Sequence, residues 1–247
     1  MREITTPVGL TDADGRLNRD AVGFARSPLI DAAGLTAQAK GRNKRWEHWT
    51  LVTPRFTLTL NIADLDYAGT AELWLLDRET GKERHRRAVL PFGRGVAVAA
   101  SGAAARSGQL MIGTEEGRIV ALAPGIELDL LVAPAGEVLA VTVPWSATRF
   151  HTTVKDVGRR ITGRLRLDAA EHPLAGWGVL DRGRGRWPYR SRWRWGAGFD
   201  PDRDVGLQLG GGWTDGTGSG RASVPDLDRA RPSPRADALR RRAAAVR

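Results

Sequence analysis

Short runs in which apolar and polar residues alternate, separated by tight turns, are the feature of this chain that most restricts its fold. Residues 56–62 read Phe-Thr-Leu-Thr-Leu-Asn-Ile, the period-two pattern of a strand with one buried face. An apolar run at 71–76, a turn at 77–81 that ends in glycine, and a further run at 84–90 together predict a hairpin. No segment before residue 220 has the apolar stripe of an amphipathic helix.

The middle of the chain repeats this scheme. Residues 109–112 and 118–122 flank a turn at 114–117, and residues 126–132 and 138–143 flank another at 134–137. Strands that recur at such short intervals predict an antiparallel meander closing into a barrel or a sandwich, and not βαβ units. Two alanine-rich pieces, 29–39 and 95–105, are compatible with either helix or strand.

A second set of strands is expected after Trp145. Residues 151–154 and 160–167 predict a hairpin around a turn at 156–158, and strict alternation places Ile161, Leu165 and Leu167 on one face. Further strands are expected at 177–180, 192–196 and 205–209. The chain then divides into a loop-rich segment (1–44), a first β unit (45–145), a second β unit (146–220) and a C-terminal segment (221–247).

The C-terminal segment differs in composition from everything before it. Residues 221–247 contain no aromatic residue and no glycine, but three prolines and eight arginines against three aspartates. Such a sequence buries too little apolar surface to offset its ordering entropy, so we expect a basic, disordered tail. It is either a natural tail or a piece foreign to the fold, such as an out-of-frame end.

The formal charge of +10 raises the question of nucleic-acid binding. Arginine outnumbers lysine 34 to 4, a bias that GC-rich codon usage would produce for any partner. The tail alone contributes five of the ten net charges, which leaves +5 on the first 220 residues. We therefore do not expect a nucleic-acid partner, and keep binding through the basic tail as a further alternative.

Several classes of protein are disfavoured by what the sequence lacks. There is no cysteine, so disulfides and thiolate metal sites are excluded. The first fifteen residues carry three acidic side chains and no apolar run, so they are not a signal peptide, and no apolar stretch approaches the ~20 residues of a membrane span. The four scattered histidines and the glycine-rich segments match no metal or phosphate-binding motif. We expect a soluble cytoplasmic protein without metal or cofactor.

Tryptophan gathers near the end of the second β unit. Five of the nine tryptophans lie between residues 177 and 215: Trp177, Trp187, Trp193, Trp195 and Trp213. An indole buries roughly 150–250 Å², so these residues either fill the core or line a cavity for an extended apolar ligand. We take all five, with Asp215, as candidate ligand-binding residues.

Two polar residues in this region could carry chemistry. Asp181 follows an apolar strand and could act as a general acid, because burial beside a hydrophobic pocket raises the pKa of a carboxyl group. The simpler interpretation is a turn residue paired with one of the arginines that follow it. Tyr189 could likewise donate a proton or only pack, and Asp215 precedes Gly216 as a turn residue would.

Five motifs, in order, resemble the bacterial family called domain of unknown function 2804. They are Gly15-Arg16-Leu17-Asn18, the segment 44–49 (Lys-Arg-Trp-Glu-His-Trp), 64–69 (Asp-Leu-Asp-Tyr-Ala-Gly), 181–189 (Asp-Arg-Gly-Arg-Gly-Arg-Trp-Pro-Tyr) and 212–218 (Gly-Trp-Thr-Asp-Gly-Thr-Gly). That family is distantly similar to the carotenoid hydratase and tocopherol cyclase group. The resemblance implies an all-β fold of two tandem lipocalin-like antiparallel barrels. Further strands would be expected where the tail begins, so the second barrel is expected to be incomplete.

The resemblance also implies a function. We expect a protein that binds or transforms a hydrophobic small molecule, a lipid or an isoprenoid. If it is an enzyme, the chemistry would be acid-driven hydration or cyclisation of a double bond, with Asp181 or Tyr189 as the proton donor. The alternative is a lipid-binding barrel without catalysis. The sequence leaves the oligomeric state open.

Overall fold

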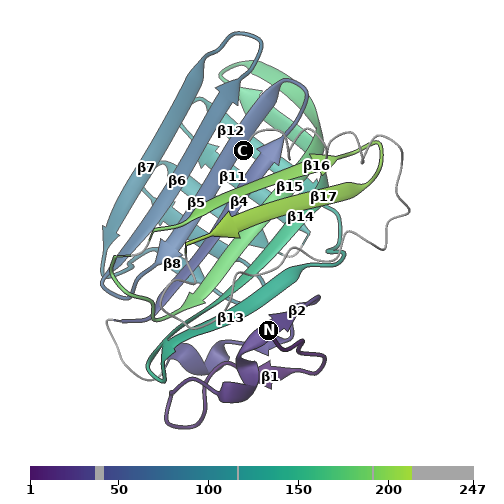
Figure 1. Cartoon of the computed structure of the whole chain (residues 1–247). Coiled ribbons are helices and arrows are strands. Elements are labelled where there is room, and N and C mark those ends of the chain that lie inside the picture. The colour runs from purple at the N-terminus through teal and green to yellow at the C-terminus, as the bar shows by residue number, and fades with distance from the viewer. Residues whose placement is uncertain (37–41, 116, 191, 213–247) are drawn as a thin grey trace.

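The structure, a computed structural model, describes residues 1–36, 42–115, 117–190 and 192–212 (Figure 1). Within these ranges the chain is almost entirely β-structure, which confirms the expected fold class. The predicted ligand residues Trp213 and Asp215 and the C-terminal segment 221–247 lie outside the described residues.

The N-terminal segment consists of short elements, two of them 3-10 helices. In order they are β1 (Val8–Gly9), η1 (Arg19–Ala21), β2 (Gly23–Ala25), β3 (Ile30–Asp31) and η2 (Ala33–Thr36).

Longer strands follow from residue 44 onward. The first group is β4 (Lys44–Val52), β5 (Phe56–Asp64), β6 (Ala68–Asp77), β7 (Glu83–Pro91), β8 (Val96–Val98), β9 (Ala103–Ser107), β10 (Leu110–Glu115), β11 (Arg118–Ala123) and β12 (Ile126–Val132). The second group is β13 (Leu139–Ser146), β14 (Arg149–Leu167), β15 (Ala170–Gly185), β16 (Arg194–Asp200) and β17 (Val205–Gly211).

One antiparallel sheet holds most of these strands and curls into a nearly closed barrel (Figure 1). Its strand order is β7-β6-β5-β4-β15-β14-β12-β11-β10-β9-β8, with β13 attached to β14 and β2 attached to β13. The alternation that predicted a strand at 56–62 places Phe56, Leu58, Leu60 and Ile62 inside, each at most 2% exposed. Their burial against the facing strands is what drives the sheet to curl, at about 1.5–3 kcal/mol for each such side chain.

The expected hairpin around residues 156–158 is wrong. Residues 149–167 form the single strand β14, which is 19 residues long. A β-bulge between Val157 and Arg159 accommodates Gly158, whose φ is 93°. Glycine adopts this positive φ without a Cβ clash, and here the chain uses that freedom to bend a continuous strand and not to reverse it.

The expected pairing of residues 126–132 with 138–143 is also wrong. Both segments are strands, but β12 pairs with β11 and with the second half of β14, whereas β13 pairs with the first half of β14 and with β2. The register sets Leu128 opposite Leu165 and Ile126 opposite Leu167. Apolar residues of β14 therefore join the barrel interior beside β12, and this burial outweighs the local turn signal at 134–137.

Strands β14 and β15 connect the barrel to the rest of the molecule. The neighbour of β14 changes along its length, because β12 pairs with residues 161–167 and β13 pairs with residues 149–155. On its other side β14 pairs with β15 throughout, and β15 pairs with β4 over residues 177–185. The sheet therefore crosses the boundary expected at residue 145, and the two-unit division of the chain stays a prediction. The ambiguous piece 95–105 contributes β8 and β9, and the described part of 29–39 contributes β3 and η2.

The first half of β14, which pairs with β13, is covered on both faces. On one face the N-terminal segment packs around Phe150, which is fully buried with Leu10, Leu17, Ala21 and Leu35. The hairpin of β16 and β17 lies across the other face (Figure 1). In the part of the chain that the structure describes, no helix is long and apolar enough to cross a membrane.

Candidate functional site

Cross-strand register gathers polar and aromatic side chains on the face beneath the β16–β17 hairpin. Asp181 of β15 lies opposite His48 of β4 on one side and Lys155 of β14 on the other. One step along, Gly183 lies between Trp46 and Thr153. Directly opposed residues project to the same face of a sheet, so these side chains form two adjacent rows.

A cavity lies between this face and the segment that precedes and includes β16. It is lined by Trp46, Trp145, His151, Thr153, Lys155, Asp181, Trp187, Trp193 and Trp195. The space open to the centre of a water molecule is about 40 Å³, room for about three waters on the usual requirement of ~10–15 Å³ for each. The cavity is narrow, with indole walls, and suits a flat or slender apolar segment.

One ion pair lies within these aromatic walls. Lys155 Nζ is 2.6 Å from Asp181 Oδ2, and the two side chains are only 12% and 11% exposed. Thr153 Oγ1 donates a hydrogen bond of 3.0 Å to Asp181 Oδ1. The Lys155 ammonium also lies 4.3 Å from the centre of the Trp195 ring, a cation–π contact. Burial lowers the pKa of Lys155, and the charge of Asp181 opposes that shift.

Next to the ion pair, an imidazole and an indole meet above a glycine. A Cβ on Gly183 would lie 2.4 Å from Trp46 Nε1 and 2.6 Å from His151 Nε2, so both nitrogens approach the backbone where only hydrogen fits. The two rings meet edge to face at 5.7 Å. Burial lowers the pKa of His151 to about 3, so its imidazole is neutral at pH 7.

Two of the tryptophans that line the cavity have a buried indole N–H group without a partner in the described part of the chain. Nε1 of Trp46 and Nε1 of Trp195 are buried and have no hydrogen-bond partner among the described residues. A buried donor without a partner costs about 1–3 kcal/mol.

Six of the predicted site residues lie in the described part of the chain, and they fall into two groups. Asp181, Trp187, Trp193 and Trp195 all line the cavity. Trp177 packs against Phe199 at a ring distance of 5.7 Å, and Tyr189 is 73% exposed, so neither lies among the cavity residues. The simpler interpretation of Asp181 as a turn residue is wrong, because it lies within β15 and is bonded to Lys155 and Thr153.

Sequence reasoning missed half of the cavity. Trp46, Trp145, His151, Thr153 and Lys155 line it as well. One signal was available: His151, Thr153 and Lys155 alternate along β14 and so share a face. The expected turn at 156–158 concealed that signal, because it ended the strand directly after Lys155.

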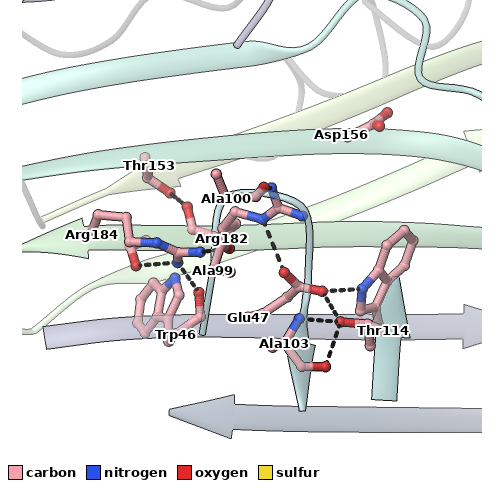
Figure 2. Close-up of polar contacts among 12 residues, drawn as sticks. Trp46, Glu47, Ala99, Ala100, Ala103, Thr114, Thr153, Asp156, Arg182 and Arg184 are labelled. Atoms are coloured by element: carbon pink, nitrogen blue, oxygen red, sulfur yellow. Dashed lines mark hydrogen bonds and ion pairs between the residues drawn. The ribbon is translucent and has the colours of Figure 1, made fainter. Parts of the chain in front are cut away.

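A second polar cluster lies inside the barrel (Figure 2). Glu47 is almost fully buried, and its carboxylate accepts hydrogen bonds of 3.0 Å from Trp49 Nε1 and 3.0 Å from Arg182 Nε, together with one from the Thr114 hydroxyl. Arg184 donates to the backbone oxygens of Trp46 at 2.8 Å and Ala99 at 2.7 Å.

This second cluster is structural. Arg182 also donates to the carbonyl of Ala100, so the two arginines hold the segment 99–103 across the end of the barrel. Burial lowers the pKa of Arg184 to about 10. Because the Glu47 oxygens already accept from three protein donors, we place the candidate site in the tryptophan-lined cavity.

The described ranges of the chain contain no group of three or more histidine, aspartate or glutamate side chains placed to hold a metal ion.

The sequence matches the profile of the family described as Domain of unknown function (DUF2804) over residues 1–222. The chain belongs to this family. The match ends where the composition changes to the arginine-rich, glycine-free segment. The family resemblance expected from the five motifs is thereby confirmed.

Comparison with solved structures places this DUF2804 chain among β proteins of similar fold. A putative AttH from Nitrosomonas europaea superposes with a TM-score of 0.52 at 15% identity, covering 68% of this chain and 60% of that one. Kievitone hydratase from Nectria haematococca gives a TM-score of 0.40 at 10% identity, with 70% and 62% covered. The chain thus spans less than two thirds of the length of either protein. No curated protein matches the sequence.

Proposed function

We propose that this DUF2804 protein binds a flat or slender apolar molecule in the tryptophan-lined cavity and transfers a proton to an activated double bond of it. The observation that supports this proposal is the buried Lys155–Asp181 pair, placed within five indoles and a neutral imidazole. A narrow cavity favours an unsaturated segment, such as an isoprenoid end or a conjugated ring, over a whole lipid.

The ion pair changes the role expected for Asp181. Lys155 Nζ lies 2.6 Å from Asp181 Oδ2, and we take the transferable proton to be the one that the Lys155 ammonium donates in this contact. Burial lowers the pKa of Lys155, which makes its ammonium a stronger acid than that of a free lysine. We therefore assign the proton donor to Lys155 and the stabilising charge to Asp181.

A hydration reaction can be written with these two groups. Lys155 Nζ gives a proton to one carbon of the double bond, and the other carbon becomes cationic beside the Asp181 carboxylate and the face of Trp195. Water adds to that carbon, and Asp181 accepts the proton that the water loses. The proton then returns from Asp181 to Lys155 across their hydrogen bond. In a cyclisation, a second double bond or a hydroxyl group of the ligand would replace the water.

Binding without catalysis is the second candidate. It is favoured by the unpartnered N–H groups of Trp46 and Trp195, which would hold a polar atom of a ligand without any proton transfer. It predicts quenching of tryptophan fluorescence by apolar ligands, with no product formed.

Isotope incorporation separates the two candidates. The purified protein is incubated with a panel of conjugated and isoprenoid alkenes in D₂O and in H₂¹⁸O, and the molecular masses of the recovered compounds are measured by mass spectrometry. Proton transfer predicts deuterium on a carbon atom of the product, and ¹⁸O as well where water adds. The rate of isotope incorporation should fall at least ~100-fold in Lys155→Met.

Lys82→Met is the matched control, because Lys82 is exposed at the turn between β6 and β7. Ligands that bind but return without either isotope would refute the catalytic proposal and leave binding alone.

A further inference from the structure

A second, larger pocket opens beside the tryptophan-lined cavity. The turn at Gly15, the start of β4, the turn at residues 148–149 and the segment 186–189 surround it. The space open to the centre of a water molecule is about 790 Å³. Three of the five family motifs, which are far apart in sequence, meet here: 15–18, 44–49 and 181–189.

The lining of this pocket is strongly cationic. Among its described lining residues are one carboxylate, Asp14, and five basic side chains. The basic side chains are Arg16, Arg42, Lys44, Arg149 and Arg186. Arg16, Arg42 and Arg149 are exposed at the rim, and none of them forms an ion pair with another described residue. We call the pocket that these five cations line the basic pocket.

Two of the five cations form a buried floor. Lys44 and Arg186 are each 6% exposed. Lys44 Nζ donates to the carbonyl oxygen of Trp187 at 3.1 Å, and Arg186 donates to Asn43 Oδ1 at 2.8 Å and to the carbonyl of Gly15 at 2.7 Å.

The positive charge of Lys44 in this floor is disfavoured by burial and by a neighbouring cation. Burial lowers the pKa of Lys44, and the charge of Arg149 lowers it further. Burial also lowers the pKa of Arg186, although Asp66 opposes that shift. An anion bound in the pocket would offset the repulsion between Lys44 and Arg149.

Trp187 is the common wall of the basic pocket and the cavity. Its ring lies 5.0 Å from Lys44 Nζ, which faces the basic pocket. The same ring lies 4.7 Å from His151 and 5.7 Å from Trp46, both of which line the cavity. A single ligand held against Trp187 would therefore present one part to the cations and another to the indoles.

We infer that the basic pocket binds the oxyanion headgroup of an amphipathic ligand whose apolar part enters the tryptophan-lined cavity. This inference rests on the proposed function, and it narrows the ligand class from apolar molecules to acids with an apolar chain or ring. The rim guanidiniums offer paired N–H donors that match carboxylate and phosphate oxygens alike. The headgroup is thus a carboxylate or a phosphate.

Matched ten-carbon ligands test the inference. Decanol, decanoate and decyl phosphate are titrated separately against the intact protein at low salt, and tryptophan fluorescence reports the Kd of each. Inorganic phosphate is titrated alone as a fourth probe. We expect at least one of the two acids to bind at least ~10-fold more tightly than decanol, and the comparison of decanoate with decyl phosphate identifies the headgroup. The preference should shrink as salt is raised, because the rim cations are exposed.

Two arginine variants complete the test. Arg149→Gln should remove most of the preference for acids while the Kd of decanol changes less than ~2-fold. Arg87→Gln, which alters an exposed arginine of β7 outside both sites, should leave the preference unchanged. Equal binding of decanol and both acids to the wild-type protein, or an unchanged preference in Arg149→Gln, would overturn the inference and leave the proposed function standing. Failure of all three ten-carbon ligands to bind would also overturn the inference, whereas the proposed function is tested separately by the panel of alkenes.

Discussion

At the scale of single residues, the site depends on a charge pair placed where water has little access. Lys155 and Asp181 lie directly opposite each other on β14 and β15 and are nine-tenths buried. Removing one partner of such a pair leaves an uncompensated charge, which typically costs 3–5 kcal/mol, whereas replacing both by apolar residues is often neutral.

That asymmetry gives the first prediction. Lys155→Met should lower the free energy of unfolding by about 3 kcal/mol, and the double variant Lys155→Met/Asp181→Leu should recover most of the loss. Urea titration followed by circular dichroism measures both values. Additive losses in the double variant would show that the two side chains do not act as a pair.

His151 gives a prediction about pH. Its pKa is about 3 in the folded protein, whereas an unfolded histidine titrates near 6.5. As the pH falls below about 6.5, the unfolded chain binds a proton that the folded chain does not bind until about pH 3. Folding stability therefore decreases as the pH falls through this window, by up to about 1.4 kcal/mol per pH unit from this residue.

The variant His151→Gln isolates the contribution of His151. Urea titrations between pH 7 and 4.5 should show a less steep loss of stability in His151→Gln than in the wild-type protein, because glutamine does not titrate. Parallel profiles for the two proteins would mean that His151 is protonated in the folded state.

At the scale of elements, glycine positions decide how β14 bends and what docks on it. Gly158 has a φ of 93°, and a Cβ there would lie 2.3 Å from the ring of Phe199 on β16. The bulge therefore both bends the strand and admits the β16–β17 hairpin.

Gly158→Ala should consequently destabilise the protein by roughly 1–3 kcal/mol, through backbone strain and the displaced Phe199 ring. Thermal melting measures the loss, and near-ultraviolet circular dichroism reports whether the tryptophans beneath the hairpin are disturbed. Gly81→Ala separates the two causes: Gly81 also has positive φ, at 70°, but no atom lies within 4 Å of its Cβ position. A Gly158→Ala loss no larger than that of Gly81→Ala would mean that contact with Phe199 contributes nothing.

The sequence predicted strands better than their partners. Alternation identified the strand at 56–62 because inward residues such as Leu58 and Leu60 contact a core that every strand of the barrel shares. Residues 126–132 pair with β14 because Leu165 of that strand is buried beside them. No local sequence pattern indicates such a distant partner. The turn expected at 156–158 failed because glycine with positive φ serves a bulge as well as a turn.

The same limit applied to the candidate site. Asp181, Trp187 and Trp195 were expected from a local cluster of motifs, and they do line one cavity. Lys155 is 26 residues from Asp181 in sequence, and only the register of β14 against β15 brings them together. Pairing across strands, which is a tertiary property, therefore supplied the charged partner that the sequence did not reveal.

At the scale of the whole molecule, the barrel and the cavity share strands β4, β14 and β15. Strand β4 supplies both Leu51 of the barrel core and Trp46 of the cavity wall. Loss of the barrel core should therefore disturb the cavity as well, because the same backbone hydrogen bonds hold both.

Leu60→Ala tests this coupling from a position inside the barrel. Deleting a buried leucine side chain costs about 2–5 kcal/mol, so the melting midpoint should fall. Far-ultraviolet circular dichroism, which follows the sheet, and tryptophan fluorescence, which includes the cavity indoles, should shift by the same amount. Two separate transitions would instead indicate that the cavity region unfolds independently of the barrel.

The claim that a ligand occupies the tryptophan-lined cavity is tested most directly by a substitution at Gly183, beside two of its lining residues. Gly183→Ala places a methyl group against Trp46 Nε1 and His151 Nε2, whereas Gly198→Ala on β16 places one where no atom lies within 4 Å. Fluorescence titration with an apolar ligand that binds the wild-type protein should show at least a ~10-fold weaker Kd for Gly183→Ala and an unchanged Kd for Gly198→Ala, with both variants folded by circular dichroism. Unchanged affinity in a folded Gly183→Ala protein would contradict the claim that the ligand occupies the tryptophan-lined cavity.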